Sequence, residues 1–130
     1  MDAFVADVLI YAAVGDRRGR PIRRLLERDF AGVGSVLLVP ELLSHPLRHG
    51  RRAEVISLQL ILSHLDLKPV DVSTADQAAI LGSKYGLRAA DAVHLATAIA
   101  ANAGRFITNN RRDFPASISE IDVTYPEHLD

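Results

Sequence analysis

The chain has 130 residues, of which 48% are hydrophobic, with 15 Lys and Arg against 16 Asp and Glu and no cysteine. That length is typical of one domain with its own core, so we predict a single domain over residues 1–130. The absence of cysteine excludes a disulfide scaffold, a zinc ribbon, an iron–sulfur site and a thiol nucleophile. No apolar run approaches the roughly 20 residues of a membrane span, and the first residues do not resemble a signal peptide. We therefore expect a soluble, cytoplasmic protein with no membrane partner.

The net charge of −1 gives the molecule no strong overall attraction for nucleic acid. Its positive charge nevertheless comes almost wholly from arginine, which clusters in residues 17–28, 48–52 and 111–112. Arginine binds phosphate oxygens with two parallel hydrogen bonds. Two interpretations stay open, a solvated surface and a rim that faces phosphate groups.

The first half of the chain alternates apolar and amphipathic segments. We expect a buried strand over residues 3–10 that runs into a helical turn, followed by a polar loop over 15–20. A helix should begin at Pro21, with apolar positions Ile22, Leu25, Leu26 and Phe30. A second buried strand should cover 35–39 and end at Pro40, and a helical stretch over 41–47 should be interrupted at Pro46.

The second half continues the alternation. We expect a periodic helix over residues 51–65 and an edge strand over 67–72 around Pro69. A helix over 74–85 should begin with a Thr74–Gln77 capping box and stop at Gly86. An alanine-rich helix over 88–103, closed by Gly104, and strands over 105–108 and 121–125 should follow. Strands that alternate with helices predict a three-layer α/β/α sandwich with a mainly parallel sheet.

Polar side chains fall where such a sheet gathers its functional residues, at the carboxyl ends of the strands. The candidates are Asp7, Glu41, Asp91, Asn110 and Asp113. Carboxylates that converge there repel one another unless a hard divalent cation enters, and Mg²⁺ or Mn²⁺ can activate water and bind a phosphodiester.

Each candidate also has a structural explanation. Glu41 and Asp91 lie near helix starts, where the dipole favours acids, and Asn110 and Asp113 follow a strand as turn residues often do. Asp7 is harder to explain in this way, because a carboxylate inside an apolar strand is costly unless it is paired. The five residues together favour a site.

The histidines give weaker signals. His45 and His49 have i, i+4 spacing but flank Pro46, so we expect surface residues there. His94 lies one turn after Asp91 and can hydrogen-bond near the pocket, although a partly buried structural role is the simpler interpretation. The chain has no GxxxxGK[ST], GxGxxG, GxSxG or HExxH motif, and VADVL does not supply the Asp-x-Asp-x-Thr/Ser of an aspartyl phosphatase.

Four segments, in this order, resemble the PIN domain, and more narrowly the VapC-type ribonuclease toxins of toxin–antitoxin pairs. They are ADVLIYAA, PELL, LRAADAVHLATAIAANAG and RFITNNRRDF. The resemblance implies an α/β/α sandwich, an endoribonuclease that depends on Mg²⁺ or Mn²⁺, an RNA substrate, frequent homodimers and inhibition by a small antitoxin protein. The apolar stretch over residues 51–65 adds weak support for a homodimer.

The resemblance also assigns site residues. Asp91 matches the metal-pocket aspartate that the family carries on a helix, and Glu41 best matches the glutamate after the second strand. Asn110 and Asp113, with Thr108 before them, match the final Thr-x-Asn-x-x-Asp segment, and Asp7 matches the second polar position of the opening motif. The implied metal ligands are Asp7, Glu41, Asp91 and Asp113.

The opening motif departs from the family at its first position, where an aspartate is usually a principal metal ligand and this chain has Val5. Valine offers no oxygen, so one metal contact is lost. On an extended strand Asp7 would point to the same face and partly substitute, whereas Asp2 would point away. Either Val5 is an inactivating change, or this chain is divergent and uses Asp7.

Three hypotheses remain from the sequence. The first is a ribonuclease toxin of the PIN type, weakened by Val5. The second is a PIN fold that binds RNA or a partner protein without turnover, and the third is a structural α/β domain whose acids are only caps and turns.

Overall fold

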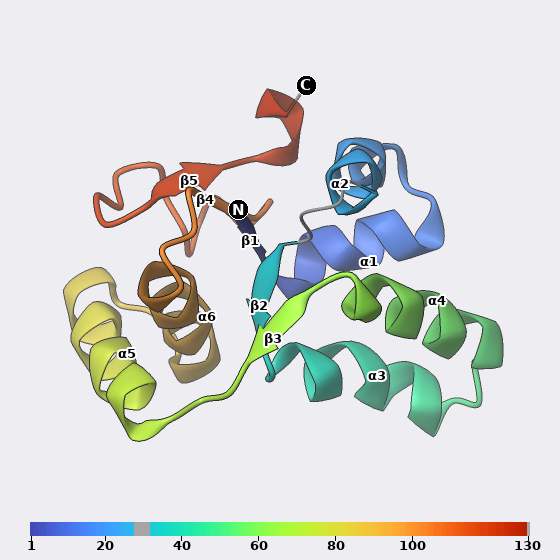
Figure 1. The fold of residues 1–130 in the computed structure, drawn as a ribbon, viewed down its shortest axis with the longest axis horizontal. Helices are drawn as coiled ribbons and strands as arrows, with labels where there is room; N and C mark the ends of the chain where they lie inside the picture. Colours follow the sequence, from blue (N-terminus) through green and yellow to red (C-terminus); the bar gives the residue numbers. More distant parts are fainter. Residues whose placement is uncertain (28–31, 130) are drawn as a thin grey trace.

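The computed structural model describes residues 1–27 and 32–129 and shows five short parallel strands between two layers of helices (Figure 1). The strands are β1 (Asp2–Phe4), β2 (Val33–Ser35), β3 (Asp66–Lys68), β4 (Arg105–Ile107) and β5 (Asp122–Thr124). Their order across the sheet is β3-β2-β1-β4-β5, and every neighbouring pair is parallel. The predicted three-layer sandwich with a parallel sheet is therefore confirmed.

Within the described part of the chain, six helices cover the two faces of this sheet. They are α1 (Ala6–Val14), α2 (Arg20–Leu26), α3 (Leu38–Arg48), α4 (Arg52–Ser63), α5 (Val72–Tyr85) and α6 (Ala89–Ala100), with two short 3₁₀ turns, η1 (Arg17–Gly19) and η2 (Pro126–His128). Figure 1 shows α5 and α6 on one side of the sheet and α1 to α4 on the other. No helix in the described residues has the length and apolar character that a membrane crossing needs.

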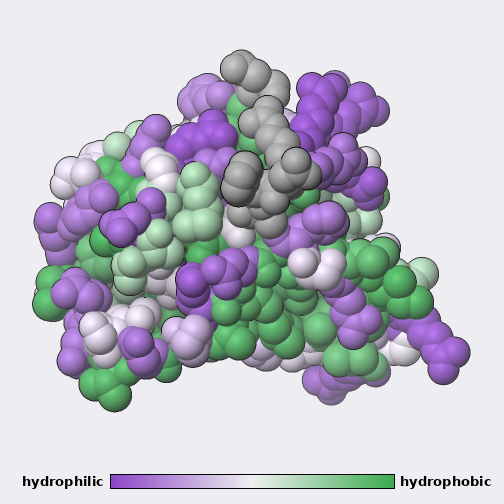
Figure 2. Space-filling model, in the orientation of Figure 1, coloured by the Kyte–Doolittle hydropathy of each residue, from purple (hydrophilic) through white to green (hydrophobic). Residues whose placement is uncertain are grey.

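Two hydrophobic clusters hold the layers together. One is centred on Leu95 of α6 and Phe106 of β4, and the other on Leu9 of α1 and Leu38 of α3, all of them at most 1% exposed. In the view of Figure 2 hydrophobic residues gather over α3 and α4, and hydrophilic residues gather over α2.

The opening segment differs from the expectation of one strand over residues 3–10. The strand ends at Phe4, and a helix begins at Ala6, because Val5 is the extended residue that caps α1 with φ −112° and ψ 171°. Asp7 therefore lies in the first turn of a helix and not inside a strand. Val8, Leu9 and Ala12 form the buried face of α1, so the apolar run reflects a buried helix.

The second strand is also displaced. β2 covers Val33–Ser35, and α3 already begins at Leu38, so SVLLV is mostly not a strand. Pro40 does not end a strand but lies in the first turn of α3, where a missing N–H costs nothing. The helix also runs through Pro46 to Arg48 without the predicted interruption.

Other boundaries shift by a few residues. η1 replaces much of the loop predicted over 15–20, α2 begins at Arg20, and the expected core position Phe30 lies outside the described residues. β3 is an edge strand, as predicted, but it ends at Lys68, before Pro69.

The boundaries of the last two helices, α5 and α6, are set by residues that lie at their ends. Asp71, and not a Thr74–Gln77 box, caps α5 by accepting from the Thr74 backbone N–H at 2.8 Å. Gly86 ends α5 with φ 66°, as predicted, in a conformation that glycine adopts without strain. α6 stops at Ala100, and Asn102 takes the left-handed conformation (φ 55°) two residues before Gly104.

Candidate active site

The carboxyl ends of β1, β2 and β4 surround a hollow of about 110 Å³ between the two helical layers. It is lined by Val5, Ala6, Asp7, Glu41, Asp91, His94, Thr108, Asn110 and Phe114. Four of the five candidate residues thus line one hollow, and Asp113 lies beside it, bonded to Asn110. Lining residues up to 109 positions apart in the sequence (Val5 to Phe114) meet because parallel strands end at the same edge of the sheet.

Asn110 and Asp113 are held together by reciprocal bonds. The Asn110 side-chain amide donates to the Asp113 carboxylate at 2.9 Å, and the Asp113 backbone N–H donates to the Asn110 side-chain oxygen at 3.1 Å. The Asn110 backbone N–H donates to the Thr108 hydroxyl at 3.0 Å. These bonds fix the segment that follows β4 and set the position of the Asp113 carboxylate.

Asp91 lies in the first turn of α6 and is partly buried. Burial raises the pKa of this carboxyl above its ordinary value of 3.8, and the negative charges of Asp113 and Glu41 raise it further. His94 and Arg88 act in the opposite direction. Burial and the two neighbouring acids therefore both disfavour the charged form of Asp91.

Glu41, in the first turn of α3, meets His94 of α6 across the hollow. The imidazole Nε2 and the Glu41 Oε1 are 2.5 Å apart. The His94 side chain is 4% exposed and that of Glu41 is 33% exposed. This contact joins the two helical layers above the ends of the strands.

The Asp7 carboxylate is occupied by the protein itself. One oxygen accepts the Val8 backbone N–H at 2.7 Å, and the other accepts the Asn109 backbone N–H at 2.9 Å and the Thr108 hydroxyl at 3.4 Å. Burial raises its pKa above 3.8, although these bonds lower it. Asp7 thus ties the start of α1 to the segment after β4.

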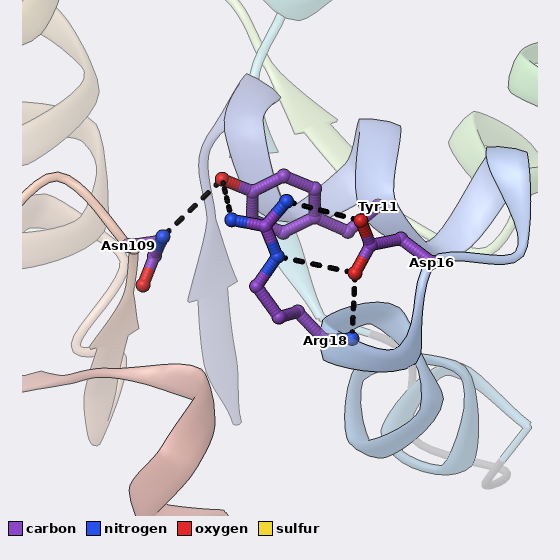
Figure 3. Close-up of polar contacts among 4 residues, drawn as sticks. All are labelled: Tyr11, Asp16, Arg18 and Asn109. Atoms are coloured by element: carbon purple, nitrogen blue, oxygen red, sulfur yellow. Dashed lines mark hydrogen bonds and ion pairs between the residues drawn. The ribbon is translucent and has the colours of Figure 1, made fainter.

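A second tie lies one turn further along α1. The Tyr11 hydroxyl accepts from the Asn109 side-chain amide and from the Arg18 guanidinium, each at 3.2 Å (Figure 3). Arg18 also lies over the Tyr11 ring, 3.9 Å from its centre, and makes two side-chain bonds to Asp16 at 3.0 and 3.1 Å. Tyr11 and Asn109 were not among the residues predicted from the sequence, and Arg18 was noted only as a member of the arginine cluster over residues 17–28. The i, i+4 spacing of Asp7 and Tyr11 on a helix would have suggested that they act on one neighbour, had the helix been predicted.

Val5 occupies the point where β1 passes into α1 and is 6% exposed. It lines the hollow and packs in the cluster of Leu95 and Phe106. At the place where the resemblance leads one to expect a carboxylate, the hollow therefore has an apolar wall.

The donor chemistry of the hollow suits a hard divalent cation, because its acidic residues offer oxygen ligands. Glu41, Asp91 and Asp113 are the residues able to hold such an ion. Within residues 1–27 and 32–129, however, no group of three or more Asp, Glu or His side chains is assembled closely enough to bind a metal as it stands. The residues fit the cation in kind, and the set is incomplete at Val5.

The model of the PIN domain family matches residues 5–117. The chain belongs to the PIN domain family. The match begins at Val5 and extends past Asp113, so it includes every candidate residue of this PIN domain. A comparison with curated proteins finds no match.

Solved structures share the fold of this PIN domain over nearly its whole length. A toxin–antitoxin complex from Klebsiella pneumoniae has a chain 23% identical, with a TM-score of 0.79, covering 97% of this chain and 98% of that one. VapBC2 from Rickettsia felis, bound to a DNA fragment from the promoter of its genes, is 18% identical with a TM-score of 0.77 and coverage of 95% and 97%. DNA-bound VapBC from Salmonella typhimurium is 14% identical with a TM-score of 0.78 and coverage of 96% and 97%.

Proposed function

We propose that this PIN domain is the toxin of a toxin–antitoxin pair and acts as an endoribonuclease that depends on Mg²⁺ or Mn²⁺. The observation that carries the proposal is the hollow at the carboxyl ends of the strands, where Glu41, Asp91 and Asn110 meet and Asp113 lies beside them. Membership of the PIN family and the likeness to chains of toxin–antitoxin complexes support it.

In this proposal Glu41, Asp91 and Asp113 hold the cation, which when bound would polarise an RNA phosphodiester and lower the pKa of the attacking water. Asn110 keeps the Asp113 carboxylate in place through its 2.9 Å bond. Asp7 and Thr108 orient the segment that carries both residues. Arg88, the exposed residue that precedes α6, lies close enough to Asp91 to act on its charge and would attract the RNA backbone.

Val5 limits this activity. A cation in the hollow would have one carboxylate fewer than the resemblance implies, and Asp7 already gives its oxygens to Val8, Thr108 and Asn109. We therefore expect weak metal binding and slow cleavage by the chain as it is.

The apolar wall at Val5 also favours a second candidate function, a PIN fold that binds RNA or a partner protein without turnover. Such a binding module would use the same surface and the same hollow, but it would hold no cation there and would not cleave RNA. The two candidates differ in whether restoring one carboxylate creates activity.

Cleavage of a mixed panel of structured and single-stranded RNA in Mn²⁺ separates them. The proteins are the natural chain, Val5→Asp, and Val5→Asp combined with Asp91→Ala. The proposal predicts slow or absent cleavage by the first, faster cleavage by the second and none by the third. If Val5→Asp binds the RNA but does not cut it, the binding module replaces the nuclease.

The partners of the proposal are an antitoxin protein and a second copy of the chain. Ile56 and Leu60, one turn apart on α4, are 56% and 62% exposed. Figure 2 shows that hydrophobic residues gather over α3 and α4. Such a surface is a candidate for a protein interface. Sedimentation at tens of micromolar tests the homodimer, and a 14.2 kDa monomer would exclude it. Growth arrest on expression of Val5→Asp, relieved by adding Asp91→Ala, tests the toxin.

A further inference from the structure

His94 is the buried histidine of the hollow, and only one of its two ring nitrogens has a partner. Nε2 lies 2.5 Å from Glu41 Oε1. Nδ1 is buried and has no hydrogen-bond partner within the described residues. The residue as a whole is 5% exposed, on an α6 face whose other buried residues are mostly alanine and leucine.

This pattern is unfavourable for a residue that serves stability alone. A buried polar atom without a partner costs free energy, and an apolar side chain of similar size would avoid that cost. The favourable part of the arrangement is the bond to Glu41, which Nε2–H donates to a carboxylate. The value of His94 must therefore lie in what it does to Glu41.

The bond restrains a long and otherwise mobile side chain. Glu41 is one-third exposed and comes from α3, whereas His94 comes from α6 on the opposite side of the sheet. Because the imidazole is packed in the core, Glu41 is held across the carboxyl ends of the strands by one of its two oxygens. The other oxygen has no hydrogen bond to the described residues, and Glu41 lines the hollow.

We propose that His94 is a positioning residue that holds the Glu41 carboxylate at the hollow, so that one oxygen stays free for a divalent cation. The proposal rests on the proposed function, because it assigns Glu41 to the cation. His94 itself touches neither the cation nor the RNA.

The first test measures the bond without any metal. His94→Leu, Glu41→Gln and the double variant are unfolded in urea, and the effects on the unfolding equilibrium constant are compared. We expect the two single effects to be non-additive by more than fivefold. Additive effects would mean that the two side chains do not act on each other, and would overturn the proposal.

The second test measures the affinity of the Val5→Asp protein for Mn²⁺ alone, by calorimetry. A histidine with a purely structural role would not change this affinity. We expect His94→Leu to weaken Mn²⁺ binding at least tenfold. His94→Gln, which keeps a donor near the place of Nε2, should have an Mn²⁺ affinity within about threefold of that of the Val5→Asp protein. In a protein that also carries Glu41→Gln, His94→Leu should have no further effect on the affinity. Unchanged affinity in His94→Leu would overturn the proposal for His94 alone. If Val5→Asp itself binds no Mn²⁺, the proposed function fails, and the role of His94 fails with it.

Discussion

The Asp7 carboxylate accepts the backbone N–H of Asn109 at 2.9 Å, although the two residues are 102 positions apart. Tyr11, one helical turn after Asp7, accepts the side-chain amide of the same asparagine. α1 therefore binds both the main chain and the side chain of Asn109, which lies in the segment after β4. Asn110, the next residue, lines the hollow, so the packing of α1 sets one wall of the candidate active site.

Tyr11→Phe should destabilise the protein by about 1 kcal/mol, because it removes the acceptor for Asn109 and Arg18 and leaves the ring in place. Urea unfolding measures the change. Asn109→Ala should cost less in the Tyr11→Phe background than in the natural chain, since the shared bond is already gone. Equal costs in both backgrounds would show that the bond between Asn109 and Tyr11 in Figure 3 contributes nothing to stability.

Gly19→Ala should destabilise by about 1–3 kcal/mol or more, because a Cβ at this position would lie 2.3 Å from the Tyr11 backbone. Gly82→Ala in α5 is the matched control. Its Cβ would meet the nearest atoms at 3.5 and 3.6 Å, which is ordinary contact, so it should stabilise by about 0.5–1 kcal/mol. If both variants unfold at the same urea concentration, η1 does not pack against α1 as closely as the structure indicates.

The pH dependence of stability should include a contribution from Glu120. The Tyr85 hydroxyl, and then Lys84, lower the pKa of this exposed carboxyl from 4.5 to about 2. The unfolded chain therefore takes up the proton first, and the stabilisation, complete above pH 4.5, is lost as the pH falls towards about 2.

Carbon NMR of the side-chain carboxyls tests this assignment. In Tyr85→Phe the Glu120 pKa should rise towards 4.5, whereas the pKa of Asp16, lowered to about 2 by Arg18, should not change. An unchanged Glu120 pKa in the variant would contradict the role of the hydroxyl.

The sequence predicted the architecture well, because the alternation of segments follows from hydrophobic patterning and Pro69 indicates the edge position of β3. It misplaced the junctions in the first half. AFVADVLI is apolar except for Asp7, and its second half begins α1, of which Val8, Leu9 and Ala12 are buried. Such a run does not distinguish a strand from a buried helix. The strand assigned to Asp7 was wrong for this reason, although Val5 and Asp7 do line the same hollow.

Candidate residues were easier to name than their contacts. Glu41, Asp91 and Asn110 line the hollow because strand ends are visible in the sequence, even where the boundaries are a few residues out. The bonds from His94 to Glu41 and from Tyr11 to Asn109 were not predictable. They depend on side chains that meet from different helices and loops, and the sequence does not show which helices and loops become neighbours.

We propose that the hollow is a PIN-domain cation site that lacks one oxygen at Val5. Calorimetric titration of Mn²⁺ into the metal-free natural chain and into Val5→Asp distinguishes this proposal from a hollow that binds no metal, with Val5→Asp/Asp91→Ala as the control. We predict one Mn²⁺ per chain in Val5→Asp, bound at least about tenfold more tightly than in the natural chain and lost in the control. Equal affinity of the natural chain and Val5→Asp, or binding that survives Asp91→Ala, would contradict the account.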